Sequence, residues 1–507
     1  MLKRMMMIFC IGYAAIYRSL PISSYPAADR RLFAYQTGKR SNMFLRSKDG
    51  TPIGPISQCM SSVKLIPGMK TLGSAGNVTD LTLIEGISDY ETSTFIQLVF
   101  ALTVPNLSSY SIPFATAFLH SIKLIETHFE EMCLCISDTD FYHSSLVRKN
   151  IRDTKFRTNL NQALENLSLE YGGLSYRSER VHQIRIECLK KNTPGILHRI
   201  WPQLGFASTA IGSSFAVYKK EIEFYCGEQL PLINLAVYLS SEGFFGVLAS
   251  IHTDEYFLTP STAFFEFIKE EDINQAQPKT LLISEIEPGQ RYELVCTTDS
   301  GLVRYRLGDV VYCTRYLSQA DNTVPLPFEQ EKIPRIPLVS IAYRVGNLIS
   351  ITGENTTEQH VMDALQRTVQ IWKQQEINVD IYDFTLYPKL DTFPSRYVMF
   401  LELFNNNSQS ENKIIDRQQC ILLNDAMSEI ERQLCEANDI YKDQRNAGKI
   451  GSLICILVRK GTFSIFLNKI LVTTNISPTQ VKPHRLLKNT QHIQFFYDNK
   501  IDAALFS

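Results

Sequence analysis

The sequence lacks an excess of charge of either sign. Its 507 residues include 51 basic and 52 acidic side chains, which give a formal net charge of −1. This balance requires no basic face, so nucleic acid is not an expected partner. Long runs of like charge and internal repeats are also missing from the sequence. With 44% hydrophobic and 20% charged residues, the composition is typical of a folded globular protein.

Sequence motifs for metal binding are missing as well. The eleven cysteines form no CxxC pair, and the nine histidines form no HExxH or similar ligand pair. These spacings argue against a dedicated metal site made by the chain itself. An odd, scattered set of cysteines is typical of buried, reduced thiols. We therefore expect a reducing compartment such as the cytoplasm.

The chain is long enough for two or more domains, and its patterns change along its length. Residues 114–132 predict a long helix, because apolar side chains recur on one stripe. Residues 205–313 contain short β-type runs, such as 263–267 and 280–284, broken by Gly, Pro and Ser. Residues 317–338 show no periodicity, which predicts a linker or a surface insertion.

After this linker, the patterns predict a smaller α+β unit. It should contain a hairpin, a helix capped by Asn355 with Glu358 three residues on, a strand, a second helix and two further strands. The hairpin is expected at 344–354, the strand after the capped helix at 396–403 and the second helix at 422–437. The two further strands are expected at 449–459 and 462–468. The predicted division is a large domain at 1–316, a hinge at 317–340 and a small carboxy-terminal domain at 341–507.

Two short motifs about sixty residues apart carry the chemistry. Each of them, Val237–Gly246 and Ser300–Asp309, is a strand-like run leading into a turn with a carboxylate. In the second motif, Gly308 lets the backbone turn closely. Asp309 is then expected at a strand exit, where α/β proteins commonly bind ligands. The two oxygens of one carboxylate can accept both hydroxyls of a vicinal diol such as ribose.

These motifs resemble the nucleotide motifs of the Gretchen Hagen three family, the acyl acid amido synthetases first known as auxin-responsive proteins. That family reads Tyr-Ala-Ser-Ser-Glu where this chain has Tyr-Leu-Ser-Ser-Glu, and Gly-Leu-Tyr-Arg-Tyr-Arg-Val-Gly-Asp where it has Gly-Leu-Val-Arg-Tyr-Arg-Leu-Gly-Asp. The resemblance is closest to animal members and extends over about residues 10–490. Further matching segments lie at 200–204, 223–227, 292–298 and 480–485.

The resemblance implies a mixed α/β, adenylate-forming fold of the kind seen in acyl-CoA synthetases and luciferases. A large body would bind ATP and a carboxylic acid, and a small body would act as a lid. The implied enzyme is an ATP- and Mg²⁺-dependent acid–amino acid ligase. It would form an acyl adenylate, which an amine or amino acid then converts to an amide. Adenylation is needed because it supplies the carboxylate with a good leaving group.

Five positions of the family pattern imply a nucleotide site. By this match, Asp309 holds the ribose hydroxyls and Tyr238 lies against the adenine. Ser240 and Ser241 donate hydrogen bonds beside the α-phosphate. Arg344 matches the hinge-region arginine that closes on the ribose. Without the resemblance, the serines and Tyr238 read equally well as turn residues and a core aromatic.

Two more positions imply the catalytic step. Glu242 would face Mg²⁺ and the phosphates, since magnesium takes hard oxygen ligands. Lys482, in the small domain, would stabilise the charge that builds up as the acid attacks the α-phosphate. Read alone, Lys482 is an exposed lysine of a basic tail that includes Arg485. Arg304 and Arg306 are expected to be structural partners of carboxylates.

One feature departs from the family pattern. Members carry a loop of the type Ser-Ser-Gly-Thr-Thr-Gly, which cradles phosphates with backbone N–H groups. The nearest segment here, residues 35–41, lacks the repeated small residues. Two interpretations follow: a ligase whose large domain is incomplete at its amino terminus, or a non-catalytic relative that binds a nucleotide or an acyl ligand.

The amino terminus leaves a third interpretation. Lys3 and Arg4 precede an apolar segment at 5–16, and small residues follow at 23–28, an order typical of a signal peptide. The apolar segment is too short to span a bilayer stably. The family instead places an internal amphipathic helix here, which we favour. The alternative is a lumenal protein of the endoplasmic reticulum or secretory pathway.

Overall fold

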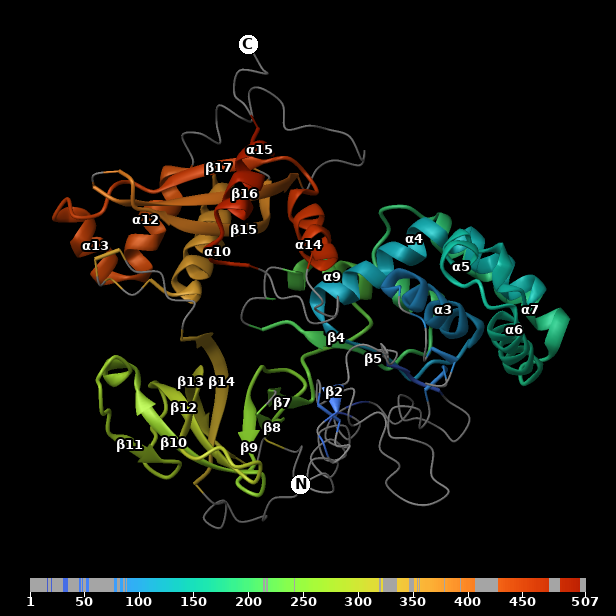
Figure 1. The fold of residues 1–507 in the computed structure, drawn as a ribbon, viewed down its shortest axis with the longest axis horizontal. Coiled ribbons are helices and arrows are strands. Elements are labelled where there is room, and N and C mark those ends of the chain that lie inside the picture. Colours follow the sequence, from blue (N-terminus) through green and yellow to red (C-terminus); the bar gives the residue numbers. More distant parts are fainter. Residues whose placement is uncertain are drawn as a thin grey trace.

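The computed structural model shows three connected lobes: a helical one, a β-rich one and a small α+β one (Figure 1). We call the first two together the large body, which extends to residue 345, and the third the small body, residues 351–501. The described residues are 16, 20, 31–34, 45–46, 48, 52–53, 77–79, 83–84, 87, and 89–501 without 213–214, 216–217, 241, 319–320, 322–334, 346–350, 353, 355, 378, 393, 406–426 and 474–483.

The helical lobe packs around a parallel sheet of order β1-β4-β5-β6. The long helix expected from residue 114 is confirmed as α4, whose buried positions include Phe118, Ile122 and Ile125. The strands are β1 (Phe33–Ala34), β4 (Ser109–Phe114), β5 (Phe206–Ala210) and β6 (Leu232–Ile233), with a separate pair β2 (Leu45–Arg46) and β3 (Pro52–Ile53). The helices are α3 (Tyr90–Thr103), α4 (Ala115–Asp138), η3 (Phe141–His143), α5 (Ser145–Asn150), α6 (Thr154–Leu169), α7 (Gly173–Leu189), α8 (Ile196–Ile200) and α9 (Lys219–Cys226).

The β-rich lobe is one eight-stranded sheet of order β11-β10-β12-β13-β14-β9-β8-β7. Neighbouring strands pair antiparallel, and the inner face buries a core that includes Phe245, Phe265 and Tyr292. Ile16 and Leu20, from the amino-terminal segment, are buried in the same core. The elements are β7 (Val237–Ser240), β8 (Gly243–Leu248), β9 (Tyr256–Leu258), β10 (Ala263–Lys269), η5 (Glu270–Asp272), β11 (Thr280–Leu282), β12 (Arg291–Thr298), β13 (Tyr305–Tyr316) and β14 (Pro337–Arg344).

Two predictions about this lobe are corrected. Asp309 does not lie at a strand exit, because β13 continues to Tyr316. Gly308, at φ +81°, instead lies where the pairing with β12 shifts its register, so it forms a bulge within the strand. The predicted hinge at 317–340 overlaps β14, which pairs with β13 up to Arg344. The large body therefore includes that strand, since its backbone completes the sheet.

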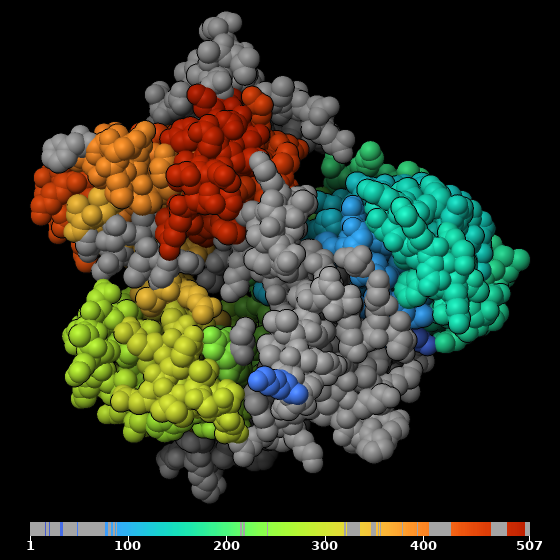
Figure 2. Space-filling model, in the orientation of Figure 1, coloured from blue at the N-terminus to red at the C-terminus, as the bar shows by residue number. Residues whose placement is uncertain are grey.

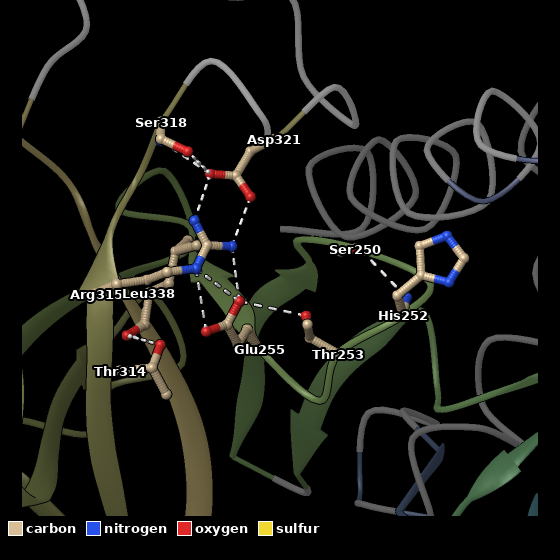
Figure 3. A network of polar contacts seen from close by, with 9 residues as sticks. All are labelled: Ser250, His252, Thr253, Glu255, Thr314, Arg315, Ser318, Asp321 and Leu338. Carbon is tan, nitrogen blue, oxygen red and sulfur yellow. Dashed lines mark hydrogen bonds and ion pairs between the residues drawn. The ribbon is translucent and has the colours of Figure 1, made fainter.

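The end of β13 is fixed by a buried polar network (Figure 3). Arg315 donates to Glu255 over 2.7 Å and to Asp321 over 2.6 Å. The Asp321 carboxylate also accepts from the backbone N–H of Ser318 over 2.8 Å. One guanidinium thereby connects β13, the start of β9 and the segment that follows β13.

The small body holds a three-stranded sheet of order β15-β16-β17. The strand predicted at 396–403 and the helix predicted at 422–437 are confirmed in their described parts, and that helix begins at Ser428. Figure 2 shows the small body and the β-rich lobe as distinct lobes of the surface. The elements are α10 (Glu358–Gln374), β15 (Val379–Lys389), β16 (Arg396–Asn405), α12 (Ser428–Ala437), α13 (Asp439–Asn446), β17 (Ile454–Val458), α14 (Thr462–Thr473) and α15 (Thr490–Asp498).

Two predictions about the small body are wrong. The segment 462–468 is not a strand but the start of α14. The Glu402 carboxylate accepts the N–H groups of Gly461 and Phe463 and so caps this helix. The cap of α10 is Thr357 rather than Asn355, and it forms a capping box with His360. Most of the predicted hairpin at 344–354 lies outside the described residues.

Among the described helices, none is both long and apolar enough to cross a membrane. Eight cysteines of the described chain are free thiols, and six of them are buried. Burial raises the pKa of several of these thiols, for example that of Cys296 to about 11. Their burial matches the expectation of cysteines packed like small apolar residues.

Candidate functional site

The two predicted motifs meet because the eight-stranded sheet curls. Three strands separate β7 from β13 in the sheet order. Nevertheless, the hydroxyl of Tyr238 on β7 donates to Oδ2 of Asp309 on β13 over 2.7 Å. The hydroxyl of Tyr305, also on β13, lies 3.4 Å from Oε1 of Glu242 after β7. The two carboxylates therefore belong to one neighbourhood.

Asp309 is a buried carboxylate at the centre of this neighbourhood, with 8% of the residue exposed. The Gly308 bulge turns the strand just before it. Arg344, its pairing partner on β14, lies with Nε 3.7 Å from Asp309 Oδ1. The same guanidinium donates to the carbonyl of Leu307 over 3.2 Å. The structure thus brings Asp309, Tyr238 and Arg344 together.

The position of Tyr238 corrects its predicted role. Its ring is 3% exposed and packs against Phe245 and Tyr256. A ring enclosed in this way presents no face on which an adenine can stack. Burial, followed by the charge of Asp309, raises the pKa of Tyr238 well above its usual value. The hydroxyl therefore stays protonated and acts as a hydrogen-bond donor to Asp309.

Glu242 lies in the β7–β8 connection. Its Oε2 accepts from the hydroxyl of Ser240 over 2.7 Å, and its N–H donates to the same hydroxyl oxygen over 3.2 Å. Burial raises the pKa of Glu242, but hydrogen bonds from Ser240 and the backbone, with Arg344 and Tyr305 nearby, hold it below its usual value. Glu242 is therefore ionised at neutral pH. Ser241 lies outside the described residues.

An ionised carboxylate of this kind is a suitable ligand for Mg²⁺, which prefers hard oxygen atoms. No group of three His, Cys, Asp or Glu side chains is arranged as a metal site in the described part of the chain. A single carboxylate such as Glu242 suits an ion that takes its remaining ligands from phosphates and water. This is the usual mode of magnesium at nucleotide sites.

The two arginines of the second motif have the structural role expected of them. Arg304 Nε donates to Glu266 over 3.0 Å. Arg306 Nε donates to Glu293, itself buried, over 3.0 Å. Both pairs connect β12 or β10 to the chain just before Asp309, and so they position the carboxylate rather than contact a ligand.

Sequence reasoning missed a second polar cluster, which joins the two bodies. Lys482 lies outside the described residues, but Arg485 three positions later is 4% exposed, so it is not part of an exposed basic tail. It pairs with Asp383 on β15, and Asp383 also accepts from Tyr218 beside α9. No motif in the sequence singles out Tyr218 or Asp383.

Comparison with solved structures identifies the fold. The structure of a GH3.15 acyl acid amido synthetase superposes with a TM-score of 0.76 at 23% identity, covering 99% of this chain and 80% of that one. The chain therefore has the fold of an acyl acid amido synthetase.

The chain belongs to the GH3 family. The family's N-terminal, central and C-terminal domain models match residues 2–232, 256–323 and 359–491. An indole-3-acetic acid-amido synthetase, GH3.17 of Arabidopsis thaliana, is 28% identical over 78% of this chain and 62% of its own length. The 4-substituted benzoates-glutamate ligase GH3.12 of the same plant is 27% identical over 75% of this chain and 60% of its own length. The chain thus spans about three fifths of these curated relatives.

Proposed function

We propose that this protein is an ATP-dependent acid–amino acid ligase. The observation that carries the proposal is the meeting of buried Asp309 and ionised Glu242 in one curled sheet. A buried carboxylate can accept the hydroxyls of a ribose diol, and an ionised one can ligate a metal ion bound to phosphate. Relatives named as an indole-3-acetic acid-amido synthetase and a benzoates-glutamate ligase support the same reaction class.

The proposed reaction has two halves. In the first, an oxygen of the carboxylic acid attacks the α-phosphorus of ATP, and pyrophosphate leaves. In the second, the nitrogen of an amine or amino acid attacks the acyl carbon, loses a proton, and AMP leaves. Mg²⁺ bound with the nucleotide would neutralise phosphate charge. The chain's contribution is to hold the nucleotide and to stabilise the charge that develops.

Individual residues have distinct proposed roles. Asp309 accepts the ribose hydroxyls, and Arg344 closes on the ribose from the end of β14. Ser241 donates beside the α-phosphate, and Ser240 does so once its hydroxyl turns away from Glu242. Glu242 ligates Mg²⁺. Lys482 supplies a cation to the first half-reaction from the small body, a role that rests on the family match alone.

The natural substrates are proposed as a small carboxylic acid and an amine or amino acid. The cytoplasm is the compartment we propose, in keeping with the free, largely buried thiols of the described chain. We interpret the motif variants in the sequence as those of an animal-type member of the family.

ATP–pyrophosphate exchange tests the ligase proposal. The full chain would be incubated with ATP, Mg²⁺ and single acids, beginning with indole-3-acetic acid and 4-substituted benzoates. The expected result is exchange that depends on one class of acid and is lost in Asp309→Ala. It should be slow, because residues 35–41 lack the repeated small residues of the phosphate-cradling loop. Leu390→Ala, a change at an exposed residue of the small body, is the control.

A second function, nucleotide binding without catalysis, is favoured by one observation. The carboxylate of Asp309 is already engaged by Tyr238 and lies near Arg344, so a ribose must share or displace these partners. AMP binding by calorimetry without exchange for any acid would support this alternative over the ligase.

A further inference from the structure

The small body contacts the large body through the first half of β15. Lys220, in the first turn of α9, lies with Nζ 3.1 Å from Oδ2 of Asp380. Lys123 of α4 lies with Nζ 3.5 Å from the hydroxyl of Tyr382. Figure 1 shows α4 and α9 in the part of the helical lobe that faces the small body. The docking surface thus joins cations of the large body to acceptors on one strand of the small body.

The centre of this contact is a hydrogen bond between two buried side chains. The hydroxyl of Tyr218 donates to Oδ2 of Asp383 over 2.6 Å. Tyr218 is 3% exposed and Asp383 is 1% exposed. The Tyr218 ring also packs edge-on against Tyr382, with centroids 6.4 Å apart. A hydrogen bond to a charged acceptor in a buried place is stronger than one in water.

Asp383 has a permanent counter-ion within its own body. Nη1 of Arg485 contacts Oδ1 of Asp383 and donates to the carbonyl of Phe384 over 2.7 Å. The guanidinium also lies 4.4 Å from the centroid of the Phe384 ring, and Nε lies 3.6 Å from Glu358. Asp383 therefore remains paired even when Tyr218 withdraws.

Asp383 has its charged partner in the small body and its neutral partner in the large body, so the two bodies can separate without breaking the ion pair. Breaking a buried ion pair leaves an uncompensated charge and is strongly unfavourable. Here the ion pair stays intact inside the small body, and at Asp383 separation breaks a bond from a neutral hydroxyl. The surrounding contacts come from Lys220 and Lys123, whose side chains are 63% and 43% exposed, and such solvent-exposed cations contribute little. Asp380, the 8% exposed partner of Lys220, keeps a partner of its own body in Lys373, whose Nζ lies 3.3 Å away.

We propose that Tyr218 and Asp383 form a latch that holds the small body docked on the large body, with Arg485 fixing the carboxylate. Opening the latch frees the small body to move relative to the large body. For its effect on catalysis this inference rests on the proposed ligase function, because the small body would act as the lid of that site. The latch itself concerns only the arrangement of the two bodies.

Single-molecule energy transfer on the full chain tests the latch. Dyes would be attached through unnatural amino acids at the exposed positions 155 and 443, one in each body. Tyr218→Phe removes the hydroxyl and keeps the ring. It should shift the ratio of docked to open molecules roughly tenfold or more toward open, the scale of one hydrogen bond to a charged group. A second variant combines it with Lys220→Glu, which places a like charge beside Asp380.

Two controls keep the result specific. Tyr110→Phe removes a buried hydroxyl that contacts Ser121 within the large body, at 2.7 Å, and should leave the interdomain distance unchanged. Lys220→Glu alone should open far fewer molecules than the double variant. Identical distance distributions in the double variant and Lys220→Glu alone would overturn the latch, as would an equal opening in Tyr110→Phe. None of these readouts requires turnover, so a failed latch and a failed ligase proposal are distinguishable.

Discussion

The hydroxyl of Tyr238 donates to the carboxylate of Asp309 across a sequence separation of 71 residues. Each residue belongs to a different motif, and each motif is recognisable in the sequence. Their contact shows that the second motif is not an isolated strand and turn. It also gives Tyr238 a new role, since the residue expected against an adenine ring instead orients the carboxylate expected to hold the ribose.

The Tyr238–Asp309 pair leads to the first prediction. Asp309→Ala should weaken AMP binding by roughly 2–4 kcal/mol, because a pair of hydrogen bonds to a charged group is lost. Tyr238→Phe should lower the free energy of unfolding by about 1–3 kcal/mol, because a buried bond to a charged acceptor is lost, but leave AMP affinity within about threefold. Calorimetric titration and chemical denaturation of both variants measure these changes.

The two variants act as controls for each other. If both weaken AMP binding equally, Asp309 and Tyr238 form one structural unit. If Asp309→Ala lowers stability strongly but leaves AMP affinity unchanged, the carboxylate serves the core and the ribose role is wrong.

The second prediction concerns Glu242. Glu242→Gln keeps the size of the side chain but removes the charge, so Mg²⁺-dependent binding of ATP should weaken about tenfold or more. Binding of AMP without metal should hardly change. Because the pKa of Glu242 is lowered, this carboxylate stays ionised as the pH falls toward the usual pKa of carboxylic acids. The metal dependence of ATP binding by the unsubstituted protein should therefore persist over that range. Equal weakening with and without metal would contradict a metal role.

The third prediction concerns Lys482. Lys482→Ala should lower the rate of adenylation about a hundredfold or more, the scale of losing one electrostatic stabiliser of a transition state. AMP affinity should barely change, because Asp309 and Glu242 belong to the other body. Single-turnover measurement of acyl-adenylate formation provides the rate. A matched loss of AMP affinity would mean that Lys482 supports the fold instead.

The fourth prediction uses the network around Arg315. Burial raises the pKa of Asp321, but hydrogen bonds from Arg315 and Ser318 outweigh it and hold the pKa below its usual value. A carboxylate with a lowered folded-state pKa stabilises the fold above its unfolded-state pKa of about 3.9, and this contribution is lost as the pH falls through the folded-state value.

Asp321→Asn should therefore lower the melting temperature clearly at pH 7, and the difference from the parent should shrink below about pH 4. Thermal unfolding at a series of pH values measures it. Glu271→Gln removes a carboxylate that is 74% exposed, and should cost less than about 0.5 kcal/mol. A difference for Asp321→Asn that is constant with pH would show that the charge of Asp321 is irrelevant.

The sequence by itself determined the local elements with clear periodicity and the family. The apolar stripe from residue 114 predicts α4, because apolar side chains that recur once per helical turn lie on one face of the helix. Such a face can be buried against many different partners. The strand at 396–403 follows from its β-type residues in the same way. The paired arginine–carboxylate role of Arg304 and Arg306 was also predictable from residue type.

Only the tertiary structure decided the rest. Residues 462–468 read as a strand, yet Glu402 from another element caps them as a helix. The Gly308 bulge keeps Asp309 inside β13, and the curl of the sheet buries Tyr238 against it. Arg485 lies in a charged segment of the sequence, yet it is buried and forms an ion pair with Asp383. In each case the deciding partner is far away in the sequence, and a local pattern contains no information about which distant side chain will satisfy a buried polar group.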